Sequence, residues 1–307
     1  MHRRVHPLLS LLLLAAVVLA LAFGIHRWRE PAIITDAQLV ALLPAGERTV
    51  FFIDFASLRR SGLLKFFAGV QPGEDRDYQQ FVKDTEFDYA RDADVLAGSA
   101  DGRDVLFIAR GRFDWNSLKR YAKAHGGACS SERCQAPAST PGRWACFRRL
   151  TPDVLVLAVG ENREALTKFR WVLSGSPETP ASAPVWVRVA PAVFRNPAAL
   201  PAPLRLFDAA VQQAESVVIS LRAAETGSTA AFNIQLDATF PSAADAQAAG
   251  KQLQLNTNML KLAALRDQGR PETGDLTGLL TAGTFESSQT HVYGKWPVSQ
   301  QVLRALE

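Results

Sequence analysis

Histidine and cysteine are scarce in this chain of 307 residues, which has five histidines and three cysteines. Beyond residue 30, the histidine bases are His125 and His291, so general acid–base catalysis by histidine has few candidate residues. The sequence also lacks the Gly-x-Ser-x-Gly, His-Glu-x-x-His, Walker A and Gly-x-Gly-x-x-Gly motifs. These absences exclude the common motif-based catalytic and nucleotide sites, whereas a Ser/His/Asp triad assembled from distant positions stays open.

A strong excess of charge is missing as well. Residues 1–30 contain four arginines and one glutamate, so they account for three of the four net positive charges of the chain. The rest of the chain is therefore close to neutral, whereas a nucleic-acid groove needs Lys and Arg concentrated on one face. We expect no nucleic-acid partner. With 48% hydrophobic and 21% charged residues, the body has the composition of a chain that buries a core.

One long apolar run lies near the N-terminus. Residues 7–25 carry no charge, and a helix of about 19 residues spans about 28 Å, close to the hydrocarbon thickness of a bilayer. Arg3 and Arg4 precede the run, which predicts a cytoplasmic N-terminus and a periplasmic or other extracytoplasmic body. Ala20-Leu21-Ala22 also fits the cleavage site of a signal peptide. We predict a single-pass inner-membrane protein anchored through residues 7–25, with residues 1–29 as signal anchor, and either alternative exports the body.

The three cysteines favour a disulfide. Cys129 and Cys134 close a short polar loop in a body expected to lie in an oxidising compartment, so we predict that they pair. Cys146 is expected to be a buried free thiol, with a Cys134–Cys146 bond as the alternative. No spacing of cysteine and histidine resembles a zinc site. The sequence therefore predicts no metal, no cofactor and no catalytic residue.

Alternating hydrophobic residues and turn signals predict an α+β fold with antiparallel sheets. A stem at residues 30–47, with a helix over 35–43, leads into the body. The expected strands are 49–55, 93–99, 104–110, 143–150, 154–159, 185–189, 216–223, 229–239, 283–286 and 290–296. The expected helices are one with Ser57 as its N-cap, 78–85, one capped by Asp114 and ending at 124, 162–173, a stretch within 191–214, and 242–266.

The body divides into two halves of similar pattern. Residues 174–184 are rich in Pro, Ser and Gly, which predicts a linker between domains at 48–175 and 184–307. Both halves have the same order of elements, and a Phe-Asp pair at 87–88 and 207–208 precedes the first hairpin strand of each. We predict an internal repeat of two similar ferredoxin-like units of the split βαβ type, with sheets either separate or joined edge to edge.

The acidic run at residues 84–94 is a candidate for Ca²⁺ coordination. It fails the EF-hand template because Tyr89 replaces the glycine of the turn and Val95 replaces the bidentate glutamate. We therefore expect a solvated helix-to-strand connection partly neutralised by Arg91.

Other candidate residues have ordinary structural explanations. His125 ends a predicted helix, where it faces the helix dipole, and His291 is expected to face solvent from a strand. Most aromatic residues are expected in the core, with Trp115 and Trp171 as candidates for exposure. Arg188 is expected to point away from the apolar face of its strand.

The chain resembles a class of uncharacterised membrane-anchored bacterial proteins with an extracytoplasmic body, a resemblance that implies no activity and no site residue. It is carried by residues 51–55 and 58–61, 87–92, 111–114, 126–129 and 294–297. The predicted function is a non-catalytic, membrane-tethered extracytoplasmic protein that acts by binding or assembly in the cell envelope, with an envelope protein as its partner. The alternatives are a hydrolase with a scattered site and a carrier or sensor for an apolar ligand.

Overall fold

Alternation of apolar side chains builds most strands of the body, as in β7, where every second residue from Val154 to Gly160 is buried. The computed structural model describes residues 34–44, 46–64, 76–169, 183–194, 205–224, 230–268 and 276–299. Its strands are β1 Thr49–Asp54, β2 Ala93–Ala100, β3 Val105–Gly111, β4 Ala128–Cys129, β5 Arg133–Pro137, β6 Trp144–Thr151, β7 Val154–Gly160, β8 Val185–Val189, β9 Ser216–Ala223, β10 Ala230–Thr239, β11 Thr284–Ser288 and β12 His291–Ser299. Its helices are α2 Asp36–Ala41, α3 Phe55–Arg60, α5 Arg76–Thr85, α6 Tyr89–Asp92, α7 Trp115–Ala124, η2 Ala165–Lys168, α8 Pro191–Phe194, α9 Arg205–Val211, α10 Ala243–Gln268 and α11 Leu276–Thr281.

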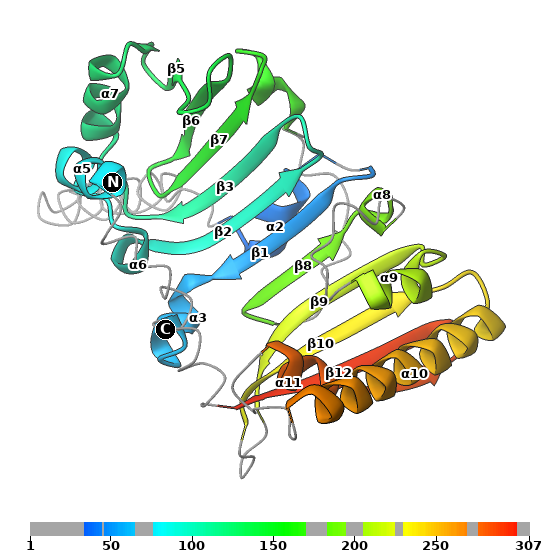
Figure 1. The fold of residues 1–307 in the computed structure, drawn as a ribbon. Coiled ribbons are helices and arrows are strands. Elements are labelled where there is room, and N and C mark those ends of the chain that lie inside the picture. Colours follow the sequence, from blue (N-terminus) through cyan, green and yellow to red (C-terminus); the bar gives the residue numbers. More distant parts are fainter. Residues whose placement is uncertain are drawn as a thin grey trace, which may run out of the picture. The chain divides into compact units, whose positions relative to one another are not determined.

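The strands form one 12-stranded antiparallel sheet in the order β11-β12-β10-β9-β8-β1-β2-β3-β7-β6-β5-β4 (Figure 1). This confirms the mixed α+β fold with an antiparallel sheet. The two halves of the chain meet edge to edge, because β1 pairs with β8 from Val50↔Arg188 to Ile53↔Val185. The sheet lies within one compact unit, Asp36–Glu307.

The ferredoxin-like strand order is wrong. In a split βαβ unit, another strand lies between the two strands that the helix connects. Here β2 pairs directly with β1, and β3 pairs directly with β2, so the first three strands form a meander. The chain between β1 and β2 contains helices, yet β2 lies directly beside β1 with no strand between them.

One cross-strand row runs through all twelve strands without a polar side chain. Directly paired residues of neighbouring strands point to the same face of a sheet. The row consists of Cys129, Cys134, Phe147, Leu157, Phe107, Gly98, Phe51, Val187, Ile219, Leu236, Gly294 and Phe285. At Gly98 a Cβ atom would overlap the ring of Phe51, so the missing side chain makes room for an aromatic neighbour.

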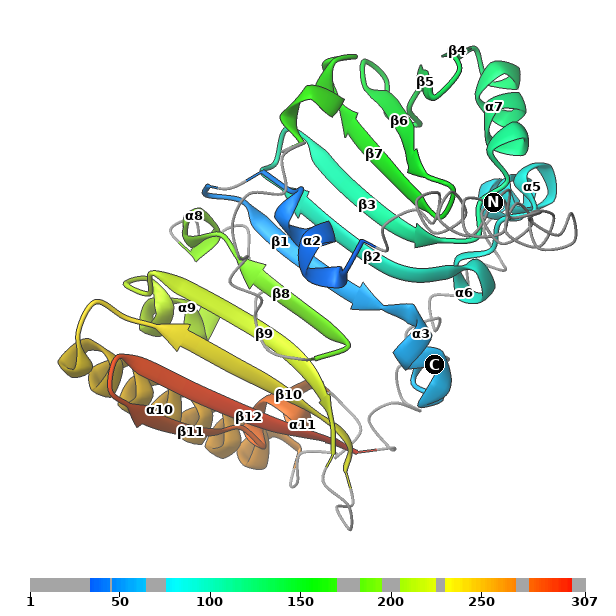
Figure 2. The same cartoon turned by 180° about the vertical axis from the view of Figure 1, so that it is seen from behind.

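Helices cover the two faces of the sheet. Figures 1 and 2 show α2 on one face and α9 and α10 on the other. Beneath α10, the buried residues Ala246, Ala249 and Leu253 pack against Leu236 and Val292. Helix α7 covers the far part of the same face, where Trp115 and Leu118 of α7 pack with Cys134 and Phe147. The remaining cluster gathers α3 and the ends of β9, β10 and β12.

Several expected elements differ in detail. Helix α3 begins at Phe55, so its N-cap is Asp54 and not Ser57. The expected helix over 162–173 is a short 3-10 turn, η2, in its described part. The hairpin of β4 and β5 was not predicted. Residues 7–25 and most of 174–184 lie outside the described residues, and the division into two domains stays a prediction. Among the described helices, none is long and apolar enough to cross a membrane.

Candidate functional site

A cavity of about 780 Å³ lies at the seam where β1 and β8 pair. Its volume is within the range of about 300–1,000 Å³ that is typical of small-molecule sites. The lining comes from α2, β1, α3, β8 and β9 and from residues next to them, so both halves of the chain contribute. Most of the lining is apolar, with Val40 of α2 and Leu63 after α3 among its members.

One wall of the cavity is an aromatic pair. Phe52 of β1 and Trp186 of β8 are direct cross-strand partners, and their rings stack with centroids 5.7 Å apart and planes 11° apart. Alternation along β1 places Phe52 on the face that carries α2, opposite to the row of Phe51. Both rings are largely buried. This wall offers a flat apolar surface to a ligand.

Two carboxylates line the cavity, Asp36 and Asp54, and the fold already uses both. Asp36 Oδ1 accepts a hydrogen bond from Arg110 Nη2 at 2.5 Å. Asp54 Oδ1 accepts a hydrogen bond from the backbone N of Ser57 at 2.8 Å, and Asp54 Oδ2 accepts one from Ser57 Oγ at 2.6 Å. The contacts of Asp54 satisfy free N–H groups at the start of α3. Asp54 is therefore a helix cap, which limits its availability to a ligand.

Arg222 of β9 is the cation of the cavity. It lies on the face of Trp186, because Trp186 pairs with Ser220, two residues earlier on the strand. Its Nε atom is buried and has no hydrogen-bond partner among the described residues. An unsatisfied buried donor costs about 1–3 kcal/mol. A ligand with a hydrogen-bond acceptor or an anionic group would satisfy this atom.

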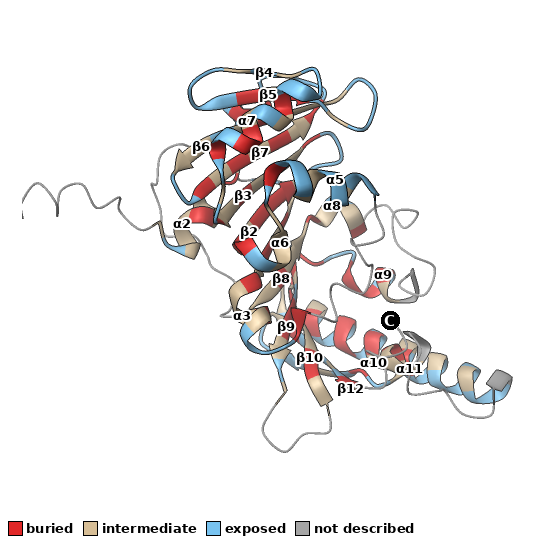
Figure 3. Cartoon of the chain, turned by 90° about the vertical axis from the view of Figure 1, so that its left-hand side faces the viewer, coloured by how far each residue is buried: buried red, intermediate tan, exposed pale blue. Residues whose placement is uncertain are grey.

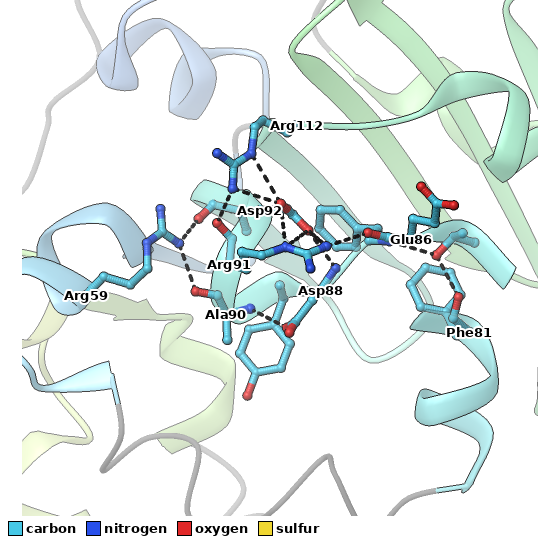
Figure 4. Close-up of polar contacts among 12 residues, drawn as sticks. Arg59, Phe81, Glu86, Asp88, Ala90, Arg91, Asp92 and Arg112 are labelled. Carbon is cyan, nitrogen blue, oxygen red and sulfur yellow. Dashed lines mark hydrogen bonds and ion pairs between the residues drawn. The ribbon is translucent and has the colours of Figure 1, made fainter. Parts of the chain in front are cut away.

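The acidic run is a separate, structural cluster (Figure 4). Asp92 is buried, and its carboxylate accepts hydrogen bonds from Arg91 Nη2 at 2.7 Å, from Arg112 Nη2 at 2.9 Å and from the backbone N of Asp88 at 3.0 Å. The hydrogen bonds and charge of Arg91 lower the pKa of Asp92 to about 2, assisted by Asp88 N–H and Arg112. The expectation of a solvated connection is therefore wrong for Asp92.

No set of three or more His, Cys, Asp or Glu side chains among the described residues is arranged to hold a metal ion. In the acidic run, Asp88 caps α6 through the N–H of Ala90, which is 2.9 Å away. Asp92 fixes the end of the same helix to Arg112, just beyond β3. These contacts explain the acidic residues by helix capping and ion pairing.

The two histidines have different surroundings. His125 ends α7, where its Nδ1 is 2.9 Å from the carbonyl of Tyr121 and its ring lies against the ring of the same tyrosine. His291 was expected to face solvent. Its side chain is 33% exposed, and its Nδ1 lies 2.7 Å from Asp237 Oδ1. A histidine–carboxylate pair is part of a hydrolytic triad, but the triad also needs a hydroxyl or thiol on the other ring nitrogen.

The disulfide prediction is confirmed: Cys129 and Cys134 are bonded, and they are direct partners in the β4–β5 hairpin. Cys146 is a buried free thiol whose Sγ donates to the carbonyl of Arg163, and burial raises its pKa. Trp115 is buried and not exposed, since it packs in a core cluster with Leu118 and Cys134. Its Nε1 donates a hydrogen bond to the carbonyl of Ser131. Trp171 lies outside the described residues.

Sequence-based reasoning did not find the cavity. It did place most aromatic residues in the core, where Phe52 and Trp186 lie, but it gave no signal for Arg222. The positions that line the cavity are up to 187 residues apart, from Asp36 to Ala223. Only the strand order brings them together.

Comparison with known proteins gives structural matches of low sequence identity. No protein-family model matches the chain, and no curated protein matches it. Among solved structures, crystal form I of TP0453 is 8% identical, with 90% of this chain and 98% of that chain covered and a TM-score of 0.48. Crystal form IV of TP0453 is also 8% identical, with 87% and 95% covered and a TM-score of 0.48.

Proposed function

We propose that this chain is a non-catalytic, membrane-tethered extracytoplasmic binding protein of the cell envelope, and that its ligand occupies the cavity over the seam where β1 and β8 pair. The observation that carries the proposal is the combination of a stacked aromatic wall, Phe52 with Trp186, and the unsatisfied Nε of Arg222 in one cavity. This combination favours an amphiphilic small molecule.

The residues that line the cavity indicate the chemical class of the ligand. The stacked rings, Val40 and Leu63 favour an acyl chain or a flat ring over a sugar or a peptide backbone. Arg222 favours a carboxylate or phosphate head group, because a guanidinium forms paired hydrogen bonds with planar anions. The proposed ligand is therefore an anionic amphiphile, which deepens the expectation of a carrier or sensor for an apolar ligand.

The cellular location belongs to the same proposal. The uncharged run at residues 7–25 with Arg3 and Arg4 before it supports a membrane tether and an exported body. The Cys129–Cys134 disulfide supports an oxidising compartment. An envelope ligand of amphiphilic character would be available to such a protein.

An internal repeat is part of the proposal too. The sheet order β1-β2-β3-β7-β6 in the first half corresponds strand by strand to β8-β9-β10-β12-β11 in the second half. In both halves a helix follows the third strand, α7 in one and α10 in the other. We propose that the two halves are copies of one unit joined through their first strands, which places the cavity at the junction of the copies.

Quenching of tryptophan fluorescence tests the binding site. The full chain is reconstituted in lipid nanodiscs and titrated with a medium-chain carboxylate that carries bromine on its acyl chain. We expect saturable quenching that Trp186→Phe removes. Arg222→Gln should weaken binding by roughly tenfold or more, the loss expected for one charge-assisted hydrogen bond.

Arg188→Gln is the matched control, because Arg188 lies on the same sheet face but does not line this cavity. Thermal unfolding establishes that each variant is folded. Quenching that is equal in the original chain and in Trp186→Phe would contradict the site. Equal affinity for the carboxylate and the corresponding alcohol would contradict the role of Arg222.

A further inference from the structure

Helix α10 has an apolar surface on the side that does not face the sheet. Its inner side is buried through Ala246, Ala249 and Leu253. Leu255, Met259 and Leu262 have 58%, 67% and 66% of their surface exposed. Residues four and three positions apart lie on the same side of a helix, so these three side chains form one stripe. Figure 3 shows the change from buried to exposed residues along α10.

Leu255 lies opposite the buried side of α10, and that buried side ends at Thr257, with no buried residue from 258 to 266. At 100° per residue, Leu255 is about 200° around the helix from Leu253. Leu265, with 41% of its surface exposed, extends the apolar surface by another turn. A monomeric soluble protein rarely exposes a contiguous apolar surface of this kind without a binding role. We therefore name Leu255, Met259, Leu262 and Leu265 the outer stripe.

The charges beside the outer stripe identify the kind of partner. Lys251, Lys261 and Arg266 are exposed on the same part of the helix. No acidic residue occurs between Asp245 and Asp267. A helix with an exposed apolar stripe whose charged neighbours on the helix are all basic fits an anionic lipid surface, where the apolar side chains enter the acyl boundary and the basic groups meet the head groups.

A second copy of the chain fits the outer stripe less well. Pairing two α10 helices would place three basic groups of each copy next to those of the other, and like charges in contact oppose association. Four side chains also provide much less area than the roughly 1,200 Å² that a stable interface buries. Charge complementarity therefore favours an anionic lipid surface, and not a second copy of the chain, as the partner of the outer stripe.

We propose that residues 251–266 of α10 bind the surface of an anionic membrane through the outer stripe. This interaction is independent of the cavity over the β1–β8 seam, which no residue of α10 lines. It would give the body a second membrane contact in addition to the predicted N-terminal anchor. Because the anchor holds the body near the bilayer, even a weak helix–lipid contact would be populated.

Met259 provides a native probe of this contact, because Met1 is the other methionine of the chain. The full chain is labelled with ¹³C-methyl methionine and reconstituted in nanodiscs of phosphatidylcholine, with or without phosphatidylglycerol. Met259→Leu assigns the signal. In anionic discs, we expect nitroxide-labelled acyl chains to broaden the Met259 signal and a soluble paramagnetic reagent to have little effect.

Variants separate the apolar and the electrostatic parts of the contact. Leu255→Gln with Leu262→Gln should remove the broadening, and these exposed positions leave the core intact. Replacing Lys251, Lys261 and Arg266 by Gln should reduce the preference for anionic discs on the order of 100-fold, since each basic group contributes about fivefold. Lys119→Gln with Lys123→Gln on α7 removes two charges away from α10 and is the control for Lys251→Gln with Lys261→Gln.

Two results would overturn the proposal. A Met259 methyl that remains accessible to the soluble reagent in both kinds of disc would show that the outer stripe does not touch lipid. Protection that rises with protein density in the disc and does not depend on phosphatidylglycerol would assign the outer stripe to a second copy. Neither result changes the quenching experiment on Trp186, so the two proposals fail separately.

Discussion

Replacing Asp92 by Asn should destabilise the body by removing a buried carboxylate that two arginines hold. Asp92 has 8% of its side chain exposed and lies 2.7 Å from Arg91 Nη2 and 2.9 Å from Arg112 Nη2. The pKa of Asp92 falls from its usual 3.8 to about 2. This difference corresponds to about 2 kcal/mol of stabilisation of the folded state when the carboxylate is ionised.

The sign of the pH dependence follows from the direction of the pKa change. A carboxylate whose pKa is lowered by folding stabilises the protein above its unfolded pKa, and that contribution is lost as pH falls through the folded pKa. The Asp92 contribution should therefore be complete at neutral pH, about half near pH 3 and absent below about pH 2. High salt should reduce it, because both guanidiniums reach solvent.

Urea unfolding of the full chain in mild detergent, followed by tryptophan fluorescence, measures this contribution. At pH 7 we expect Asp92→Asn to lower the free energy of unfolding by about 1–2 kcal/mol. Asp94→Asn is the matched control: Asp94 is half exposed and pairs with Arg59 at 2.8 Å, so its loss should cost less than about 1 kcal/mol. Equal effects of the two substitutions, or an Asp92→Asn effect that does not shrink at pH 3, would refute the reasoning.

Three further predictions concern the cysteines, the location and the histidines. Mass spectrometry without reductant should show Cys129 bonded to Cys134 and a free Cys146, and reduction should cost at most about 2–3 kcal/mol because the closed loop is short. Free thiols at both positions in the exported protein would count against the bond. A reporter fused after Glu307 should be active only when exported, and cytoplasmic activity would rule out the topology. His125→Ala and His291→Ala should leave the body folded and ligand binding unchanged, whereas loss of a hydrolytic activity in a folded variant would favour the enzyme alternative.

The sequence was informative wherever one face of an element is buried. Alternation located strands such as β7 and β9 to within a residue or two, because a strand with one buried face has a period of two. Asp114 was correctly predicted as the cap of α7, where its side chain accepts from the N–H of Asn116. The disulfide was predicted from spacing and compartment. In each case the signal lies within a few residues.

The missed features depend on contacts between distant segments. The buried side of α10 and its outer stripe are both apolar, so periodicity alone could not show that Leu253 is buried and Met259 is exposed. The start of α3 lies three residues before the expected position, because Asp54 is also a good cap and precedes Ser57. The strand order depends on which edges pair, and the pattern of hydrophobic residues is the same for a meander and for a split βαβ unit.

The candidate site also depends on contacts between distant segments, and these contacts leave one polar atom without a partner among the described residues. Asp54 and Arg222 carry opposite charges on one face of the sheet, yet β8 lies between their strands. Two strand spacings separate them by about 10 Å, and Asp54 is committed to the cap of α3. The fold therefore places a buried guanidinium nitrogen beside a stacked aromatic pair and supplies no described partner for it. Such an arrangement lowers stability when it is empty, and an anionic amphiphile would reverse that loss, so ligand binding should raise the stability of the body and Arg222→Gln should remove the increase.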